Sequence, residues 1–232
     1  MFIQVDRATK RYKSGDVETI GIQQATLELA KGDIGVILGP SGSGKSTLLN
    51  MIGGIDRVDS GKIIINGINI CAMHEKELTE YRRKQVGFIF QAYHLISHLT
   101  VQENIEMISQ ISENPLPMDH VLSAVGLTDK ANRFPRELSG GEQQRVAIAR
   151  SVIKNPQVLL CDEITGALDY ASSIQVLEMI QEINRTYGTT VLLITHNQAI
   201  AAMANNVYQF RSGEVTEVRT NSQPVDARGI VW

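Results

Sequence analysis

Two kinds of apolar spacing alternate along the chain. Continuous apolar runs, which are typical of strands buried on both faces, occur at 34–38, 158–161 and 191–194. Between these runs, apolar residues recur with the spacing of one helix face in the segments 48–52 and 174–183. Gly53 and Gly188 follow these two segments, and glycine in that place is typical of a helix C-terminus. Buried strands alternating with amphipathic helices predict an α/β fold with a mainly parallel sheet.

Other parts of the chain depart from this alternation. Residues 26–29 alternate in polarity, and 62–65 form an apolar run before the turn at Asn66-Gly67, so both predict strands. From about 92 to 154 strand patterns are scarce and helical spacing dominates, as in Val146, Ala149 and Ile153. The prolines near 115 break this pattern, and Asp119 is expected to cap the helix that follows.

These patterns divide the chain. We expect one domain over 1–232, with a core of about 1–91 and 155–219 and an inserted helical subdomain of about 92–154. The remaining segment, 220–232, is polar and is expected to be frayed.

Composition narrows the class of protein. The chain is 43% hydrophobic and 20% charged with a net charge of −3, which is ordinary for a globular protein and offers no bulk attraction to nucleic acid or anionic lipid. Two cysteines are too few for a disulfide framework. No apolar run approaches the ~20 residues of a membrane span, and the N-terminus lacks the pattern of a secretory signal. We therefore expect a cytoplasmic chain that neither enters the membrane nor binds nucleic acid.

A glycine-rich loop follows the first buried run. Its sequence fits the phosphate-binding pattern G-x-x-x-x-G-K-[ST], in which backbone N–H groups and the start of the next helix surround phosphate oxygens. Lys45 is expected to neutralise the β- and γ-phosphates, and Ser46 to bind Mg²⁺. The expected nucleotide-binding residues are Gly39, Pro40, Ser41, Gly42, Ser43, Gly44, Lys45, Ser46 and Thr47. A chance Gly/Ser loop is the alternative, but the strand before it and the helix after it favour phosphate binding.

Two carboxylates end the run at 158–161. Residues at the carboxyl end of a parallel strand face the ligand crevice of an open α/β sheet. We expect Asp162 to hold Mg²⁺ and Glu163 to polarise an attacking water. The alternative is a solvated strand end, which the nearby phosphate loop disfavours.

The segment Leu138-Ser139-Gly140-Gly141-Glu142-Gln143-Gln144-Arg145 opens a helix and so forms a second anion site. With this segment the sequence closely resembles the ATP-binding cassette (ABC) transporter family over about residues 2 to 215. The resemblance implies a P-loop NTPase core, an N-terminal antiparallel β subdomain and an inserted helical subdomain. It also implies that two subunits enclose two ATP molecules head to tail. Ser139, Gly140, Gly141 and Glu142 would then cap the γ-phosphate of the ATP bound by the partner subunit.

The resemblance assigns roles to four further residues. Tyr12 matches the aromatic residue that stacks on adenine, and Gln91 matches the glutamine that approaches Mg²⁺ and the attacking water. Asp169 belongs to the loop that crosses to the partner subunit, and His196 matches the histidine that contacts the γ-phosphate. One position departs from the family pattern, because Ile164 stands where the family usually has proline after the two carboxylates.

The resemblance also implies a partner. We expect a permease encoded separately, with the cassette peripheral on the inner face of the cell membrane. Stretches such as Gly54-Ile55-Asp56 resemble the branch that exports lipoproteins, macrolides or antimicrobial peptides. A regulatory clamp that signals to a cell-wall enzyme without transport is the alternative, and the sequence does not separate the two.

Overall fold

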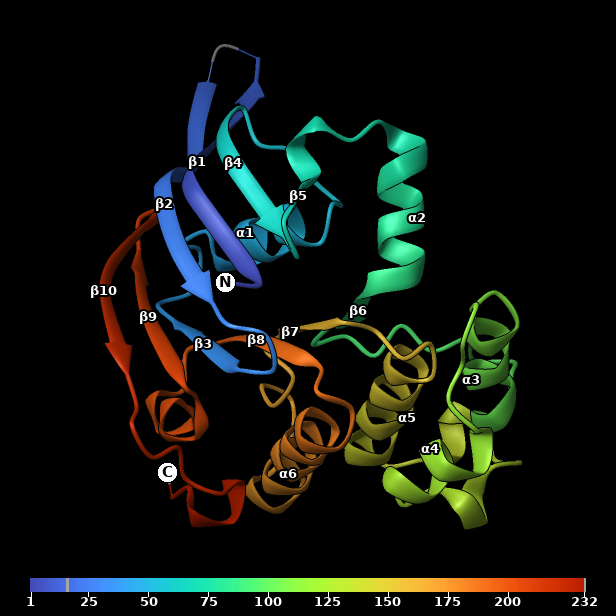
Figure 1. The fold of residues 1–232 in the computed structure, drawn as a ribbon. Coiled ribbons are helices and arrows are strands. Elements are labelled where there is room, and N and C mark those ends of the chain that lie inside the picture. Colours follow the sequence, from blue (N-terminus) through green and yellow to red (C-terminus); the bar gives the residue numbers. More distant parts are fainter. Residues whose placement is uncertain (16, 232) are drawn as a thin grey trace.

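The computed structural model describes residues 1–15 and 17–231, and Trp232 of the expected polar tail lies outside them. Within these residues the strands form two sheets, which Figure 1 shows side by side. The smaller sheet has the order β2-β1-β4-β5 and pairs antiparallel. Its strands are β1 (Ile3–Ser14), β2 (Val17–Leu29), β4 (Ser60–Ile65) and β5 (Ile68–Asn69). The antiparallel β subdomain that the family resemblance implies is therefore present.

The larger sheet has the order β10-β9-β3-β8-β7-β6. Its strands are β3 (Ile34–Leu38), β6 (Val86–Ile89), β7 (Val158–Asp162), β8 (Thr190–Thr195), β9 (Asn206–Arg211) and β10 (Glu214–Thr220). All of its neighbouring strands pair in parallel except β9 and β10. The α/β prediction with a mainly parallel sheet is confirmed.

Helices cover this sheet on both faces. The α-helices are α1 (Lys45–Ile52), α2 (Glu75–Gln85), α3 (Val101–Gln110), α4 (Met118–Ala124), α5 (Gly140–Val152) and α6 (Tyr170–Tyr187). Short 3-10 helices are η1 (Ile70–Ala72), η2 (Thr128–Lys130), η3 (Pro135–Glu137), η4 (Gln198–Met203) and η5 (Ala227–Gly229). None of the helices in the described part of the chain has the length and apolar character needed to cross a membrane.

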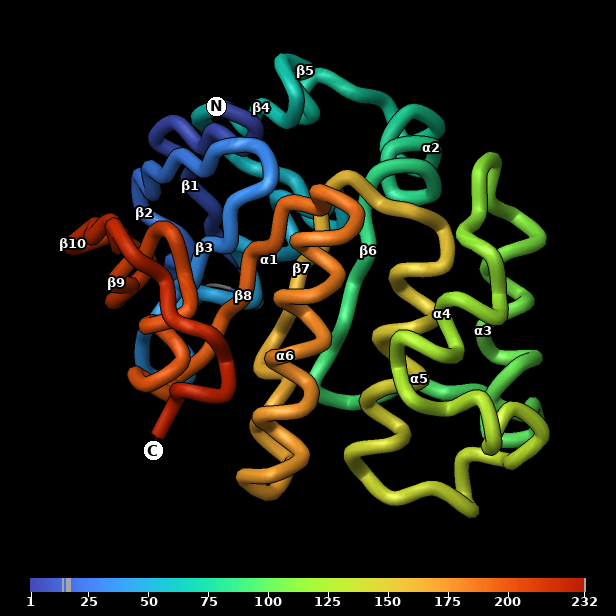
Figure 2. Tube along the Cα trace, turned by 60° about the horizontal axis from the view of Figure 1, so that its bottom comes forward, coloured from blue at the N-terminus to red at the C-terminus, as the bar shows by residue number. Residues whose placement is uncertain are grey.

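Three apolar clusters fill the described structure. The first joins α1 to both sheets, and the second packs α6 and part of α5 against the other face of the larger sheet. The third lies among α3, α4 and α5, away from the sheets (Figure 2), and it includes the predicted helix face Val146, Ala149 and Ile153. Residues 92–154 thus contain helices with an apolar cluster of their own, while the domain boundaries stay a prediction.

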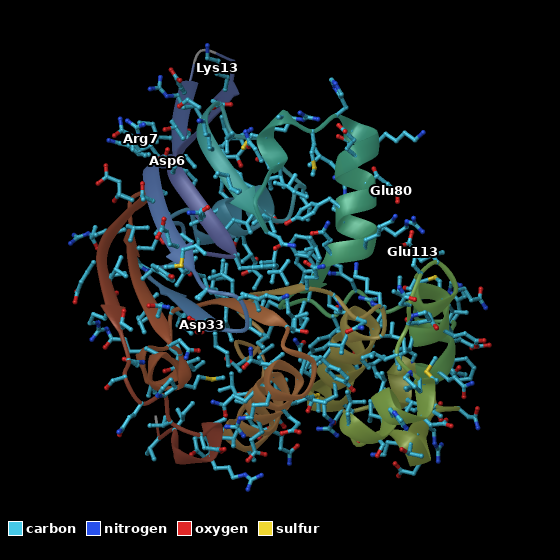
Figure 3. All side chains as sticks on the ribbon, viewed as in Figure 1. Asp6, Arg7, Lys13, Asp33, Glu80 and Glu113 are labelled. Carbon is cyan, nitrogen blue, oxygen red and sulfur yellow. The ribbon has the colours of Figure 1, made fainter. Side chains whose placement is uncertain are left out.

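Ion pairs tie this helical region to α2. Arg83 and Lys84 of α2 lie between Glu80 and Glu113, with N–O distances of 2.6–3.4 Å. Figure 3 shows Glu80 on α2 facing Glu113 in the segment after α3. Because these side chains are partly exposed, each pair contributes little alone, but the four charges form one network.

Two expectations were wrong. Asp119 does not cap α4, because the helix begins at Met118 after the extended Pro117 and Asp119 lies inside the first turn. There its charge still favours the positive end of the helix. The segment after β10 is also not frayed as far as Ile230, because Ala227 and Ile230 are buried against the second cluster.

The start of α5 is stabilised by a reciprocal cap. Ser139 is the N-cap residue, and its Oγ accepts a hydrogen bond from the N–H of Glu142. The Glu142 carboxylate accepts the N–H of Ser139 at 2.7 Å and also pairs with Lys130. Lys130 and the backbone donor both favour the ionised form, so they lower the pKa of Glu142 from 4.5 to about 2.

We expect Glu142→Gln to destabilise the fold in a pH-dependent way. Because the pKa of the carboxyl is lowered in the folded chain, its stabilising charge is present above pH 4.5 and is lost as the pH falls toward about 2. The variant should lower the free energy of unfolding by about 1–3 kcal/mol at pH 7. Denaturant unfolding across this pH range measures the difference.

The exposed Glu106 of α3 offers the matched control, Glu106→Gln, which should change stability little at any pH. The account is contradicted if the Glu142→Gln difference stays constant down to pH 2, because the lost contribution would then not be electrostatic.

Candidate active site

The phosphate loop lies between β3 and α1, at the carboxyl edge of the larger sheet. Two of its glycines, Gly39 and Gly44, lie where a side chain does not fit. A Cβ on Gly39 would lie 2.2 Å from the carbonyl oxygen of Phe210, and one on Gly44, whose φ is +103°, would lie 2.3 Å from that of Gly21. Ser43 Oγ is buried and has no hydrogen-bond partner among the described residues. A phosphate oxygen supplies the partner that this hydroxyl lacks, so the loop fits the ligand its sequence predicts.

Lys45 is folded back over this loop. Its side chain is 4% exposed, and its Nζ donates to the carbonyl oxygens of Gly39 and Pro40 at 2.9 and 2.8 Å. The same Nζ lies 4.0 Å from Glu163 Oε1. Burial lowers the pKa of Lys45, and the charges of Glu163 and Asp162 oppose this shift. The ammonium group is thus held at the site by carbonyl oxygens that a more negative ligand can replace.

The carboxylates at the end of β7 differ in environment. The Asp162 carboxylate accepts a hydrogen bond from the Ser46 hydroxyl, while burial raises the pKa of Asp162. Glu163 has φ +46°, an uncommon left-handed conformation for a residue other than glycine. Its N–H donates to the carbonyl of Ile194 at 3.0 Å, and the next residue, Ile164, is 2% exposed in the second apolar cluster. These neighbours hold the Glu163 side chain at the site.

His196 and Gln91 complete this end of the site. His196 follows β8, and its Nδ1 lies 3.3 Å from Glu163 Oε2. Gln91 follows β6, and its Nε2 lies so close to Gly166 that a Cβ there would be 3.1 Å away. Hydroxyl, carboxylate and amide oxygens of Ser46, Asp162 and Gln91 form a donor set that suits Mg²⁺, which takes its remaining ligands from phosphate and water.

Tyr12 lies at the other end of the same cavity. Its hydroxyl donates to Asp56 Oδ2 at 2.7 Å, and Lys10 Nζ lies 5.3 Å from the ring centroid and 2.8 Å from Asp56 Oδ1. A Cβ on Gly21 would lie 2.8 Å from the ring, so only glycine leaves room for it. Lys10, Asp56 and Gly21 support this ring and were not predicted, because single contacts of this kind leave no periodic pattern in the sequence.

The cavity has a volume of about 480 Å³. It is lined by Tyr12, Thr19, Ile20, Gly21, Ser41, Gly42, Gly44, Lys45, Ser46, Thr47, Gln91, Asp162 and Glu163. Residues predicted from four separate motifs therefore meet around one space, while their individual roles stay predictions.

The predicted residues at the starts of α5 and α6 lie outside this lining. Gly140 and Gly141 approach Tyr93, Leu168 and Ser172, and Asp169 caps α6 by accepting from the N–H and Oγ of Ser172 at 3.0 and 2.7 Å. Ser139, Gly140 and Asp169 are all exposed. The structure thus separates Ser139, Gly140, Gly141, Glu142 and Asp169 from the cavity of their own chain.

Comparison with known proteins agrees with this geometry. The family model described as ABC transporter matches residues 22–166. The putative ABC transporter ATP-binding protein MG065 homolog of Mycoplasma pneumoniae is 40% identical over 99% of this chain and 50% of its own length. The macrolide export ATP-binding/permease protein MacB of Burkholderia pseudomallei is 38% identical over 94% of this chain and 34% of its own length. The chain spans about half the length of the first curated relatives it matches.

A solved structure gives the same fold. The dimeric, post-hydrolysis ATP-binding cassette MJ0796, bound to ADP and Pi, superimposes with a TM-score of 0.86 at 33% identity, covering 94% of this chain and 98% of that one. The overall fold therefore agrees with that of a solved ATP-binding cassette, and the matched range of the family model includes the phosphate loop, Asp162 and Glu163. The chain belongs to the ABC transporter family and is an ATP-hydrolysing cassette of that family.

Proposed function

We propose that two copies of this chain close head to tail around two ATP molecules, and that hydrolysis reopens them. The observation that carries the proposal is the separation of the Ser139–Glu142 segment from the cavity on its own chain. This segment presents an exposed helix N-terminus, which favours an anion, yet it faces no phosphate site of its own subunit. A second copy supplies that phosphate. The dimeric state of the MJ0796 cassette supports this arrangement.

Within each cavity, the chain's groups have distinct tasks. Tyr12 stacks on the adenine, while the loop amides and Lys45 balance the phosphate charge. Ser46, Asp162 and Gln91 hold Mg²⁺, which when bound neutralises charge on the β- and γ-phosphates. The Ser139 segment of the partner then completes the set of donors around the γ-phosphate.

Glu163 acts on the attacking water. Its left-handed backbone and the contact with His196 direct the carboxylate toward the space between Lys45 and Gln91. In this position Glu163 orients the water and accepts its proton as the bond to phosphorus forms. His196 holds Glu163 on one side and contacts the γ-phosphate on the other.

The work of this cycle is delivered to a membrane permease on a separate chain. Support comes from MJ0796, a solved cassette that this chain matches over 98% of its length. The likeness to MacB, whose name joins macrolide export to an ATP-binding and permease protein, supports an export role. We propose that closure and reopening transmit force to such a permease, with a lipoprotein, macrolide or antimicrobial peptide as the exported compound.

Glu163→Gln should separate binding from hydrolysis. The amide still orients water but accepts no proton, so kcat for ATP hydrolysis should fall about 100-fold or more. ATP binding should persist, and light scattering after size exclusion should show an ATP-dependent dimer. Glu182→Gln, at an exposed position of α6, is the matched control and should hydrolyse ATP at the wild-type rate. Unchanged turnover in Glu163→Gln would remove the assigned base.

The permease proposal has its own test. Tagged Glu163→Gln protein with ATP should capture a membrane protein from detergent-solubilised membranes of the source cell, identified by mass spectrometry. Lys45→Ala protein, which lacks the phosphate contact, should capture markedly less. A permease with a large outer domain is the expected result. If the trapped dimer captures no membrane protein, the transport role is contradicted while the ATPase assignment stands.

A further inference from the structure

The segment after β10 packs against η4 and α6, the two helices that follow His196 and the loop containing Asp169. We call residues 221–231 the strap. It runs past η4 and reaches α6, as the red end of the ribbon in Figure 1 shows. Asn197 caps η4 and directly follows His196, whereas Asp169 caps α6. The strap therefore connects η4, which follows His196 and its contact with Glu163, to α6, which follows Asp169.

The first half of the strap is fixed on η4. The side-chain amide of Asn221 donates to the carbonyl oxygens of Ala201 and Ala204 at 2.9 and 2.7 Å. The N–H of Val225 donates to the carbonyl of Ala202 at 2.9 Å. These bonds satisfy carbonyl groups at the end of a short helix, so the strap completes η4 as well as covering it.

The second half is fixed on the middle of α6. The Gln181 side chain is 4% exposed and forms two hydrogen bonds with the strap. Its Nε2 donates to the carbonyl of Val225 at 2.9 Å, and its Oε1 accepts a hydrogen bond from the N–H of Ala227 at 2.8 Å. Ala227 and Ile230 are 0% and 2% exposed in the cluster that holds the apolar face of α6. A buried amide whose nitrogen and oxygen both bond to the strap fixes one position of the strap along the helix.

The last contact reaches the first turn of α6. Tyr170, the residue after Asp169, donates its hydroxyl to the carbonyl of Ile230 at 2.8 Å. Two residues later, Ser172 lies against the start of α5, where a Cβ on Gly141 would be 2.9 Å from Ser172 Oγ. A shift of the first turn of α6 therefore moves Asp169 and, through Ser172, also displaces the start of α5 with the Ser139 segment.

We propose that Tyr170 is a positioning residue, which together with the strap holds Asp169 and the start of α6 in place for contact with the second copy of the chain. The inference rests on the proposed function, because it concerns the surface on which two copies close. Among the described residues, the lining of the ATP cavity includes neither Tyr170 nor any residue of the strap. Loss of the strap contacts therefore affects closure and turnover while ATP binding to the single chain is kept.

The test uses three variants of the full chain. Ala227→Asp places a charge in the buried contact and releases the strap, and Tyr170→Phe removes one hydroxyl from a side chain of the same shape. Gln223→Asp adds the same charge at an exposed strap position and is the control. Each variant is measured for ATP affinity, for kcat and KM, and, combined with Glu163→Gln, for the ATP-dependent dimer.

Ala227→Asp should lower kcat about 10-fold or more and weaken the dimer, because a small displacement of groups at a closing site has large kinetic effects. ATP affinity of the single chain should stay within about twofold, Tyr170→Phe should change kcat in the same direction by less, and Gln223→Asp should match wild type. The proposal is overturned if kcat and dimerisation are unchanged in Tyr170→Phe and Ala227→Asp. It is also overturned if ATP affinity falls as far as kcat, since that indicates general loss of structure. A Glu163→Gln chain with an intact strap that fails to dimerise would instead contradict the proposed function.

Discussion

The parallel pairing of β3, β8, β7 and β6 is the constraint on which the site depends. Their registers align Leu38 with Thr195, Ile194 with Asp162, and Cys161 with Ile89, so these strands end at one edge of the sheet. The loop that follows each strand then starts from a fixed place. The phosphate loop, Glu163 and His196 directly follow β3, β7 and β8, and Gln91 is the second residue after β6. These residues meet because the strands before them are hydrogen-bonded in that register.

Several groups of the site lower the stability of the folded chain. Lys45 is buried and Asp162 is partly buried. Burial lowers the pKa of Lys45 and raises the pKa of Asp162, so it disfavours the charged form of both. Glu163 has an uncommon backbone conformation. Each of these features opposes folding in the absence of a ligand. They persist because the apolar clusters on both faces of the sheet fix the strands on which the site is built. A ligand that brings phosphate charge next to the buried Lys45 ammonium offsets the cost of burying that charge, which links binding to stability.

Much of this arrangement follows from sequence patterns. Buried runs and helical spacing predicted the parallel sheet, and the position of Asp162 and Glu163 at the end of such a run placed them at one edge, while the role of His196 came from the family resemblance. Patterns of this kind report which face of an element is buried, and little else. They therefore missed the tether between Tyr12 and Asp56, which joins separate elements through single polar contacts. The contacts of the strap were not predicted for the same reason. Of its residues only Ala227 and Ile230 are buried, and it is held partly by backbone hydrogen bonds, so its sequence shows no hydrophobic periodicity.

In the proposed dimer each ATP lies between the phosphate loop of one chain and the Ser139 segment of the other. This arrangement is tested most directly by mixing two inactive variants, Lys45→Ala and Ser139→Asp. Aspartate still caps the helix but places a negative charge toward phosphate, while Ser139→Asn caps it without charge and should remain active. In a mixed dimer, one site combines both changes and the other is wild type. We expect ATPase activity in the mixture that neither variant shows alone. A mixture as inactive as its components would place the Ser139 segment on the ATP of its own chain and contradict the account.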